Sequence, residues 1–477
     1  FYDNSKPLPK SRFREDVTTI GMPLTEICNA TYDDPRQRQL FKNIMYIGAL
    51  SHLLDMDPAV IEALIAQQYK AKVKLLDANK HALHLGRDYA REHLDPIGLR
   101  VRKADNVGDK IFIDGNSAAA LGCVYGGATV CAWYPITPSS SLAEAFQSYC
   151  QKYRVDPETG KNRYAMIQAE DEIASIGIVT GAGWNGARAF TTTSGPGISL
   201  MNEFIGLAYF AEIPVTIIDV QRGGPSTGMP TRTQQSDILP AAYASHGDTK
   251  HVLLLPEDPH ECFEFSAQAF DLADRLQTPI FVMTDLDIGM NQRLCAPFTW
   301  DDARDYDRGK VMSAEELEAG RDFGRYKDVD GDGIPYRTYP GTHPTKGSFF
   351  TRGTSRDPYA RYSERGPDYL YNMERLLQKF DTAKALVPQP ILRTAKKKAS
   401  FGAIHYGSTS PSMAEAITAL EAQDRGRPAH DLDAFACEPE LDRIGTAQPG
   451  VVRPIPIGQK VEPLVLRAEP SPGGPRP

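Results

Sequence analysis

The sequence lacks two features that many redox and membrane proteins carry. It has no C-x-x-C pair, and no apolar stretch reaches eighteen residues. An iron–sulfur cluster needs clustered thiolates, so we expect this chain to hold none by itself. Without a long apolar stretch, no transmembrane helix is expected either. The seven cysteines stand singly at Cys28, Cys123, Cys131, Cys150, Cys262, Cys295 and Cys437. Scattered single cysteines are typical of a reducing compartment, so we expect a cytoplasmic protein.

The sequence also lacks an excess of positive charge. Lysine and arginine number 53 against 61 aspartates and glutamates, a net charge of -8, which argues against nucleic acid as the main partner. The composition, 41% hydrophobic and 24% charged, is ordinary for a globular protein, and 477 residues suffice for two to four domains. No signal peptide is recognisable, but the first residue is Phe1 rather than Met, so a targeting segment cannot be judged.

Hydrophobic periodicity divides the chain. Residues 37–94 have apolar positions at helical spacing, which predicts three helices, one of them starting at the proline of DMDPAV. From residue 110 onward, short β-branched stretches alternate with helical ones, beginning with KIFIDGNSAAALGCVYGG. This alternation predicts a doubly wound α/β domain with a mostly parallel sheet. In such a sheet, the segments YPITPSS, AEDE, TTTSGPG and QRGGPSTGMPTRTQQ would meet at the carboxyl ends of the strands.

The second half of the chain is less regular. Residues 291–397 are rich in proline, glycine, arginine and tyrosine, with one amphipathic helix expected near YNMERLLQKFDTA. Such a long irregular segment is typical of an interface, a lid or a link between domains. SFGAIHYGSTSPSMAEAITALEA, from residue 400, predicts a second strand–loop–helix unit. After residue 424 the periodicity is lost, and the chain ends in a segment with a disordered composition.

An acidic segment, DVDGDG, opens like a calcium-binding loop. Its twelfth position is Tyr339 instead of the usual glutamate. It also contains GDG, the start of the magnesium motif of thiamine diphosphate enzymes, but the first asparagine after it is Asn372, too distant for that motif. Two interpretations stay open: a divalent metal site or a solvated turn. The candidate ligands are Asp328, Asp330 and Asp332.

Four separated motifs together carry a family resemblance. YPITPSS, EDEIASIG, TTTSGPG and RGGPSTGMPTRTQQSD, in this order, resemble the alpha subunit of 2-oxoacid:ferredoxin oxidoreductases. DVDGDGIPYRTYPGTHP and the helical N-terminal segment resemble the 2-oxoglutarate type, in which a gamma domain is fused ahead of alpha. The resemblance covers about residues 20–425.

The resemblance implies a domain plan. Residues 1–106 would be the C-terminal, mainly helical part of an α/β gamma domain whose first half is absent. Residues 107–292 would form the pyrimidine-type thiamine-diphosphate-binding domain, and 293–397 a loop-rich linker or interface segment. Residues 398–432 would begin a transketolase C-terminal-like α/β domain that is truncated, and 433–477 an irregular tail that does not resemble the family.

The resemblance also implies a site. The family has a glutamate nine residues before the Gly-Ala of its helix, which matches Glu172 before Gly181. Its carboxyl group would bond N1′ of the thiamine pyrimidine, whereas Glu170 and Asp171 would be helix N-terminal acids. The cofactor would also contact a set of backbone and side-chain groups at Tyr134, Pro135, Ile136, Ser194 and Gly195.

The substrate contacts implied by the family are Thr137, in a catalytic position, and Arg222, which would bind the 2-oxoacid carboxylate. Arg232 is the candidate for a second carboxylate. The expected reaction is oxidative decarboxylation of 2-oxoglutarate with coenzyme A, with ferredoxin as electron acceptor. A beta subunit would supply the diphosphate and Mg²⁺ site and a 4Fe–4S cluster. The alternatives are a pyruvate or branched-chain 2-oxoacid enzyme, and a non-catalytic regulatory or binding subunit.

Overall fold

A computed structural model describes the whole chain except residues 71, 104–106, 393–402, 425–446, 449–450 and 453–477. The chain divides into two compact units, Phe1–Gly108 and Asp109–Pro477. Residues 398–402, at the start of the expected domain 398–432, and most of the expected tail 433–477 lie outside the described residues. In the described part of the tail, the structure has a short hairpin of β11 (Ala447–Gln448) and β12 (Val451–Val452).

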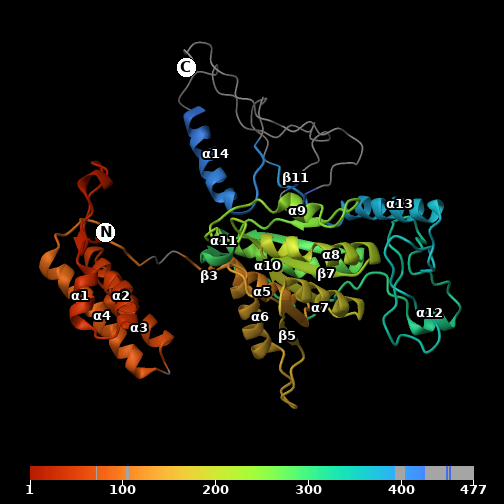
Figure 1. Ribbon diagram of the computed structural model, residues 1–477, viewed down its shortest axis with the longest axis horizontal. Helices are drawn as coiled ribbons and strands as arrows, with labels where there is room; N and C mark the ends of the chain where they lie inside the picture. Colours follow the sequence, from red (N-terminus) through yellow and green to blue (C-terminus); the bar gives the residue numbers. More distant parts are fainter. Residues whose placement is uncertain (71, 104–106, 393–402, 425–446, 449–450, 453–477) are drawn as a thin grey trace, which may run out of the picture. The chain divides into compact units, whose positions relative to one another are not determined.

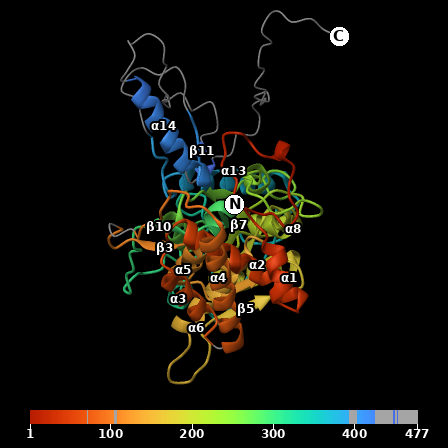
Figure 2. The same cartoon turned by 90° about the vertical axis from the view of Figure 1, so that its left-hand side faces the viewer.

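The first unit is mainly helical, and its helices lie side by side in both views (Figures 1 and 2). The three expected helices are confirmed, and a fourth, α1, precedes them. Aspartates cap α2 and α3, and each cap is followed by a proline at the first helical position. The elements are β1 (Tyr2–Asp3), η1 (Lys10–Arg12), β2 (Gly21–Met22), α1 (Leu24–Thr31), α2 (Pro35–Leu53), α3 (Pro58–Gln68) and α4 (Val73–His93).

Helices α2 and α4 approach each other closely because glycines face each other across the contact. A Cβ added to Gly48 would overlap the carbonyl oxygen of Leu83, and one added to Gly86 would overlap that of Met45. Met45, Ala49 and Ala90 are buried in the apolar cluster of this unit. Small residues therefore determine how closely these two helices pack.

The second unit is built on a six-stranded sheet of order β5-β4-β6-β7-β9-β8, and every strand pair in it is parallel. The predicted doubly wound α/β architecture is confirmed. The strands are β4 (Val130–Trp133), β5 (Ala165–Gln168), β6 (Ala189–Thr193), β7 (Val215–Gln221), β8 (Val252–Leu254) and β9 (Pro279–Asp285). Along β7, alternate residues face opposite sides, because Ile217 and Ile218 belong to different apolar clusters.

Helices cover both faces of the sheet (Figure 1). One apolar cluster joins the sheet to α5 (Gly115–Tyr125), α6 (Ser140–Tyr153) and α10 (Pro259–Leu276). The other joins it to α7 (Glu172–Trp184), α8 (Gly195–Ala211) and α9 (Ile238–Ala242). The strands β6, β7 and β9 are buried along their whole length, which explains their continuous apolar and β-branched sequences.

Two expected strands differ from the structure. The stretch before α5 forms β3 (Ile111–Ile113), but β3 pairs antiparallel with β10 (Arg293–Cys295) instead of joining the main sheet. The described part of SFGAIHY, Ala403–Tyr406, forms no strand. Among the described residues this stretch pairs with no strand. Tyr406 bonds Thr409 of the turn η2 (Gly407–Thr409), which leads into α14 (Ser410–Asp424), and Gln235 of the loop after β7. The remaining short helix is α11 (Leu286–Met290).

The irregular segment after β10 contains α12 (Ala314–Glu318) and α13 (Gly366–Ala383), the expected amphipathic helix. This segment is fixed to the sheet domain by buried charges. Glu212, directly after α8, is fully buried and forms ion pairs with Arg356, Arg375 and Lys379. A second buried acid, Asp274 on α10, bonds Arg337 at 2.8 Å.

These ion pairs predict a strong asymmetry between two substitutions. Glu212→Gln leaves three buried cations without their acid, so we expect the free energy of unfolding to fall by ~3–5 kcal/mol. Lys379→Met should cost less, because burial lowers the pKa of Lys379 to about 7 and two arginines remain on Glu212. Denaturant unfolding at neutral pH measures both. Equal losses in the two variants would contradict the central role of Glu212.

Candidate active site

The four loops expected at one rim do meet there. They follow β4, β5, β6 and β7, whose parallel pairing puts all their carboxyl ends at one edge of the sheet. A direct contact joins two of the loops, because Arg222 Nη1 donates to the carbonyl oxygen of Thr137 at 3.2 Å. The prediction that these motifs gather is therefore confirmed.

Glu172 is the first residue of α7 and lies at this rim. Its side chain is 6% exposed, and no described residue hydrogen-bonds its carboxylate. Asp171 has a different role: it caps α7 by accepting the N–H of Ala174 at 2.7 Å. Glu170 is exposed. The structure thus separates the three neighbouring acids into a buried one without a partner, a helix cap and a surface group.

The first turn of α8 lies beside Glu172. A Cβ added to Gly197 would overlap Thr193 Oγ1 and come within 3.0 Å of Glu172 Cγ. Ser194, the N-cap, is fully buried, and among the described residues its hydroxyl has no hydrogen-bond partner. The N-terminal turn of α8 therefore carries a buried hydroxyl without a partner among the described residues, and the same turn contacts Glu172.

The loop 134–139 joins β4 to α6. Tyr134, Pro135 and Thr137 are exposed, and Ile136 is half-buried. The carbonyl oxygen of Ile136 accepts the N–H of Ser139 at 2.9 Å, so the loop turns directly into α6. In this loop, the side chains of Tyr134, Pro135 and Thr137 are therefore open at the rim.

The two arginines expected to bind carboxylates differ in their surroundings. Arg222 is 6% exposed, and its guanidinium donates to the carbonyl oxygens of Gly223, Thr137 and Met229. Arg232 is exposed and, among the described residues, donates only to the carbonyl oxygen of the preceding Thr231, at 2.8 Å. Arg222 therefore holds the shape of the loop, and Arg232 is the freer cation of the two.

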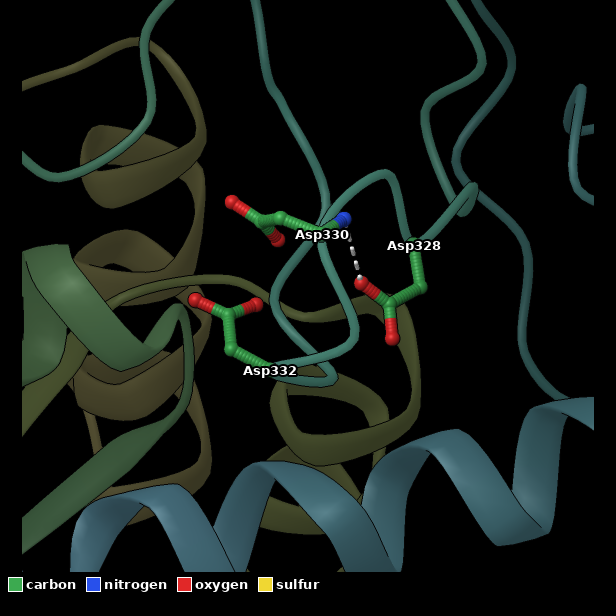
Figure 3. A group of neighbouring side chains, drawn as sticks. All are labelled: Asp328, Asp330 and Asp332. Carbon is green, nitrogen blue, oxygen red and sulfur yellow. Dashed lines mark hydrogen bonds between the residues drawn. The ribbon is translucent and has the colours of Figure 1, made fainter.

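The three aspartates of DVDGDG lie in one turn, with carboxylate oxygens within 4.8 Å of one another (Figure 3). Lys310 Nζ contacts this turn, at 2.6 Å from Asp330 and 2.8 Å from Asp332. Asp328 instead accepts the backbone N–H of Gly331 at 2.9 Å. A lysine ammonium therefore already supplies positive charge where a metal ion was one of two expectations.

This acidic turn lies away from Glu172. The carbonyl oxygen of Gly333 accepts from Arg375, which pairs with Glu212 at the C-terminal end of α8. Glu172 contacts the opposite, N-terminal end of the same helix. The three aspartates and the rim residues therefore do not form one site.

Two acids at the rim were missed by the sequence analysis. Asp219 is in the middle of the buried strand β7, and burial followed by the nearby Asp237 raises its pKa well above the usual value. Burial also raises the pKa of Asp237 to about 6. A signal was present in VTIIDVQ, where one acid interrupts a buried strand pattern.

Comparison with known families identifies the class of protein. The description "pyruvate flavodoxin/ferredoxin oxidoreductase, thiamine diphosphate-binding" matches residues 121–323. The description "pyruvate ferredoxin/flavodoxin oxidoreductase" matches residues 1–89. The second unit of this chain thus carries the thiamine-diphosphate-binding α/β domain of that group of enzymes.

Two individual relatives show which enzymes of this class the chain is similar to. The chain is 33% identical over 414 residues to the alpha subunit of 2-oxoacid:ferredoxin oxidoreductase 2 from Aeropyrum pernix, covering 84% of this chain and 63% of the relative. It is 43% identical over 190 residues to 2-oxoglutarate synthase subunit KorA from Methanothermobacter thermautotrophicus, covering 40% and 48%. The chain is similar to these subunits and spans less than two thirds of their length. The resemblance carried by the four motifs is confirmed.

A solved structure has the same fold. It is the 2-oxoglutarate:ferredoxin oxidoreductase from Magnetococcus marinus with 2-oxoglutarate, coenzyme A and succinyl-CoA bound. The TM-score is 0.68 and the sequence identity 27%, over 84% of this chain and 67% of that one.

The close packing at α8 predicts opposite effects of two glycine substitutions. Gly197→Ala should lower the free energy of unfolding by ~1–3 kcal/mol, because its Cβ overlaps Thr193. Gly181→Ala in α7 is the matched control, since a Cβ there meets no atom within 4 Å and alanine favours the helix by up to ~1 kcal/mol. Denaturant unfolding compares the two. A Gly197→Ala chain as stable as Gly181→Ala would exclude the close contact.

Proposed function

We propose that this chain is the alpha subunit of an enzyme that oxidatively decarboxylates a 2-oxoacid, with 2-oxoglutarate as the main substrate. The acyl group passes to coenzyme A, CO₂ is released, and ferredoxin is reduced. The observation that carries the proposal is the buried, unpartnered Glu172 carboxylate beside the glycine-lined first turn of α8. The names of the relatives and of the solved neighbour support the same activity.

The residues at the rim fit thiamine diphosphate. Glu172 offers a carboxyl group with limited solvent contact, and Ser194 a hydroxyl without a partner among the described residues. Tyr134 and Pro135 are exposed on the loop after β4, which leaves this part of the loop accessible to a ring. When bound, thiamine diphosphate would supply a nucleophilic carbon and a cationic ring that stabilises the negative charge left by decarboxylation. The role proposed for Glu172 is to hold a proton at the pyrimidine N1′.

The chain's other rim groups would bind and orient the 2-oxoacid. Thr137 is exposed beside Arg222, whose guanidinium has two further N–H groups beyond its three loop contacts. Arg232 is exposed and would bind a distal carboxylate, which 2-oxoglutarate has and pyruvate lacks. A pyruvate or branched-chain 2-oxoacid enzyme is the alternative within this family.

A beta subunit is proposed to complete the site with the diphosphate and Mg²⁺ ligands and a 4Fe–4S cluster. Support comes from the six described cysteines, which are all buried and free. The aspartates 328, 330 and 332 lie away from Glu172 and contact Lys310, so they are poor candidates for the cofactor's metal. Exposed apolar side chains at the rim, Ile173, Met229 and Leu239, offer a surface for such a partner.

The domain roles expected from the sequence remain part of this proposal: a gamma-type first unit, a cofactor domain, and a loop-rich linker or interface segment. No helix among the described residues is long and apolar enough to span a membrane. A cytoplasmic location rests on the scattered single cysteines. A non-catalytic subunit is the alternative from another class, and failure of the assembled complex to bind thiamine diphosphate would favour it.

The role of Glu172 is tested in a complex with the beta subunit. Glu172→Gln should lower kcat ~10²–10⁴-fold, the range for a lost general acid–base group, while thiamine diphosphate still binds. Calorimetry measures binding, and CO₂ release measures turnover. Glu170→Gln is the matched control, because Glu170 is exposed and should leave kcat unchanged. Wild-type turnover in Glu172→Gln would refute the assignment.

The arginines are tested with two substrates. A charge-assisted hydrogen bond contributes ~1.5–3 kcal/mol, so Arg232→Met should reduce kcat/KM for 2-oxoglutarate by about one to two decades. The value of kcat/KM for pyruvate should fall little. Arg222→Met should reduce kcat/KM for both substrates alike, because Arg222 also holds the loop through three carbonyl oxygens. An unchanged ratio of the two kcat/KM values in Arg232→Met would show that Arg232 does not select the substrate.

A further inference from the structure

The loop 222–237 carries both arginines of the proposed site, and hydrogen bonds close it on itself. The N–H of Gly223 donates to the carbonyl oxygen of Arg232 at 2.7 Å. Nearer its base, Gln221 Oε1 accepts the N–H of Asp237 at 3.2 Å. These bonds join the two ends of the loop to each other. The position of the exposed Arg232 therefore depends on how the residues between it and Asp237 are held against the rest of the rim.

One side chain in that stretch, Gln235, attaches the loop to the end of β9. Its Nε2 donates to Asp285 Oδ2 at 2.9 Å. Asp285 is the last residue of β9 and is 1% exposed. Its other oxygen accepts the N–H groups of Asp287 and Ile288 at 2.9 and 3.0 Å, so the start of α11 fixes this carboxylate. Because an ionised carboxylate only accepts hydrogen bonds, the atom that faces it must be the amide nitrogen of Gln235.

The turn that precedes α14 packs on the same pair. The N–H of Ser408 donates to Asp285 Oδ2 at 3.3 Å. The hydroxyl of Tyr406 donates to the carbonyl oxygen of Gln235 at 3.4 Å, and Gln235 Nε2 lies 3.4 Å from Ser408 Oγ. Gly407 has a φ of +60°, and a Cβ there would come within 2.6 Å of Gln235 Nε2. The Gln235 amide is thus enclosed between β9 and a turn that has no room for a side chain at its centre.

The place of Gln235 in the chain connects this contact to the proposed site. Gln235 is three residues after Arg232. The turn that it contacts is itself held on the domain, because Tyr406 packs against the apolar cluster that joins the sheet to α7, α8 and α9. A hydrogen bond that ends on a carboxylate belongs to the stronger class. The loop is therefore held by a strong bond against elements that are already fixed.

We propose that Gln235 is a positioning residue that holds the Arg232 loop against Asp285 and the turn 406–409, and so sets where a distal substrate carboxylate binds. This inference rests on the proposed function, in which Arg232 binds that carboxylate. Without the Gln235 amide, Asp285 and Ser408 can stay bonded to each other, but the loop loses its side-chain attachment to both. Substrate binding would then have to order the loop, and that cost opposes binding.

The attachment is tested in the full chain by amide hydrogen exchange, a measurement that does not depend on activity. In Gln235→Ala, the peptides that contain Gly223 and Ser408 should exchange ~10–100-fold faster, the factor for one lost hydrogen bond to a charged group. The first peptide reports on the loop and the second on the turn. Gln234→Ala is the matched control, because Gln234 is exposed and hydrogen-bonds no described residue. Unchanged exchange in Gln235→Ala, or a change in only one of the two peptides, would overturn the attachment.

Reversing the pair shows whether the contact is direct. Gln235→Glu places a second carboxylate against Asp285, and two like charges at hydrogen-bonding distance repel each other. Both peptides should then exchange at least as fast as in Gln235→Ala. Adding Asp285→Asn restores one donor and one acceptor, and the oxygen that remains can still accept the N–H groups at the start of α11. The double variant should return toward the wild-type rates. Rates as fast as those of Gln235→Glu would overturn the direct contact.

Substrate selection is measured in the assembled complex with the beta subunit. Gln235→Ala should raise KM for 2-oxoglutarate with kcat nearly unchanged, so that kcat/KM falls by up to about one to two decades, the loss expected for Arg232→Met. The value of kcat/KM for pyruvate and the Kd for thiamine diphosphate should change little, and Gln235→Glu with Asp285→Asn should recover the use of 2-oxoglutarate. An equal fall for both substrates would overturn the positioning of Arg232. A wild-type complex that does not decarboxylate 2-oxoglutarate would instead refute the proposed function, and the exchange data would be unaffected.

Discussion

The parallel direction of the six main strands is the constraint on which the rest of this chain depends. Each strand must end at the same edge, so every connection into a following helix begins there. The N-termini of α7 and α8 consequently lie at one rim, and their unsatisfied N–H groups and dipoles favour negative charge. Glu172, Asp171 and Asp237 all lie at these termini. The acidic character of the rim therefore follows from the topology of the sheet.

At the opposite edge of the sheet, buried charges attach the irregular segment to the domain. The segment after β10 has few regular elements, so it cannot attach itself to the domain through a strand ladder. Instead, Glu212 and Asp274 attach the segment to the domain, because each forms ion pairs with basic side chains of the irregular segment. Several of these arginines also donate to backbone carbonyl oxygens, as Arg337 does to that of Arg308 at 2.9 Å and Arg375 to that of Gly333 at 3.0 Å. Burying such ions is costly, and removing the single acid would leave the cations unpaired.

Much of the fold could be predicted from the sequence because its signals are local. Helical spacing gave the helices α2–α4, and alternating β-branched and helical stretches gave the parallel sheet with its rim of loops. The strand expected near residue 403 failed, since a strand needs a partner that the local sequence does not reveal. The pairing of β3 with β10 joins residues far apart in the chain and left no local signal.

The candidate site could be predicted in part, for the same reason. The choice of Glu172 among three neighbouring acids came from the family resemblance, whereas the separation of Asp328, Asp330 and Asp332 from the rim depends on tertiary contacts with α13. Lys310, which contacts two of these aspartates, is some twenty residues earlier in the sequence. Asp219 was missed because an acid inside an apolar strand is understood only when its neighbours are known.

The exposure of the rim bears on how such a site can work. A carboxyl group bonds a ring nitrogen strongly only where water is excluded. Glu172 is nearly buried at the start of α7, but Tyr134, Thr137 and Arg232, on other loops at the same rim, are exposed. Exposed apolar groups, Ile173, Met229 and Leu239, lie on the same loops and helices. A covering surface that buries these groups would also dry the carboxylate, which is the physical reason to place the other half of the proposed site on a second subunit.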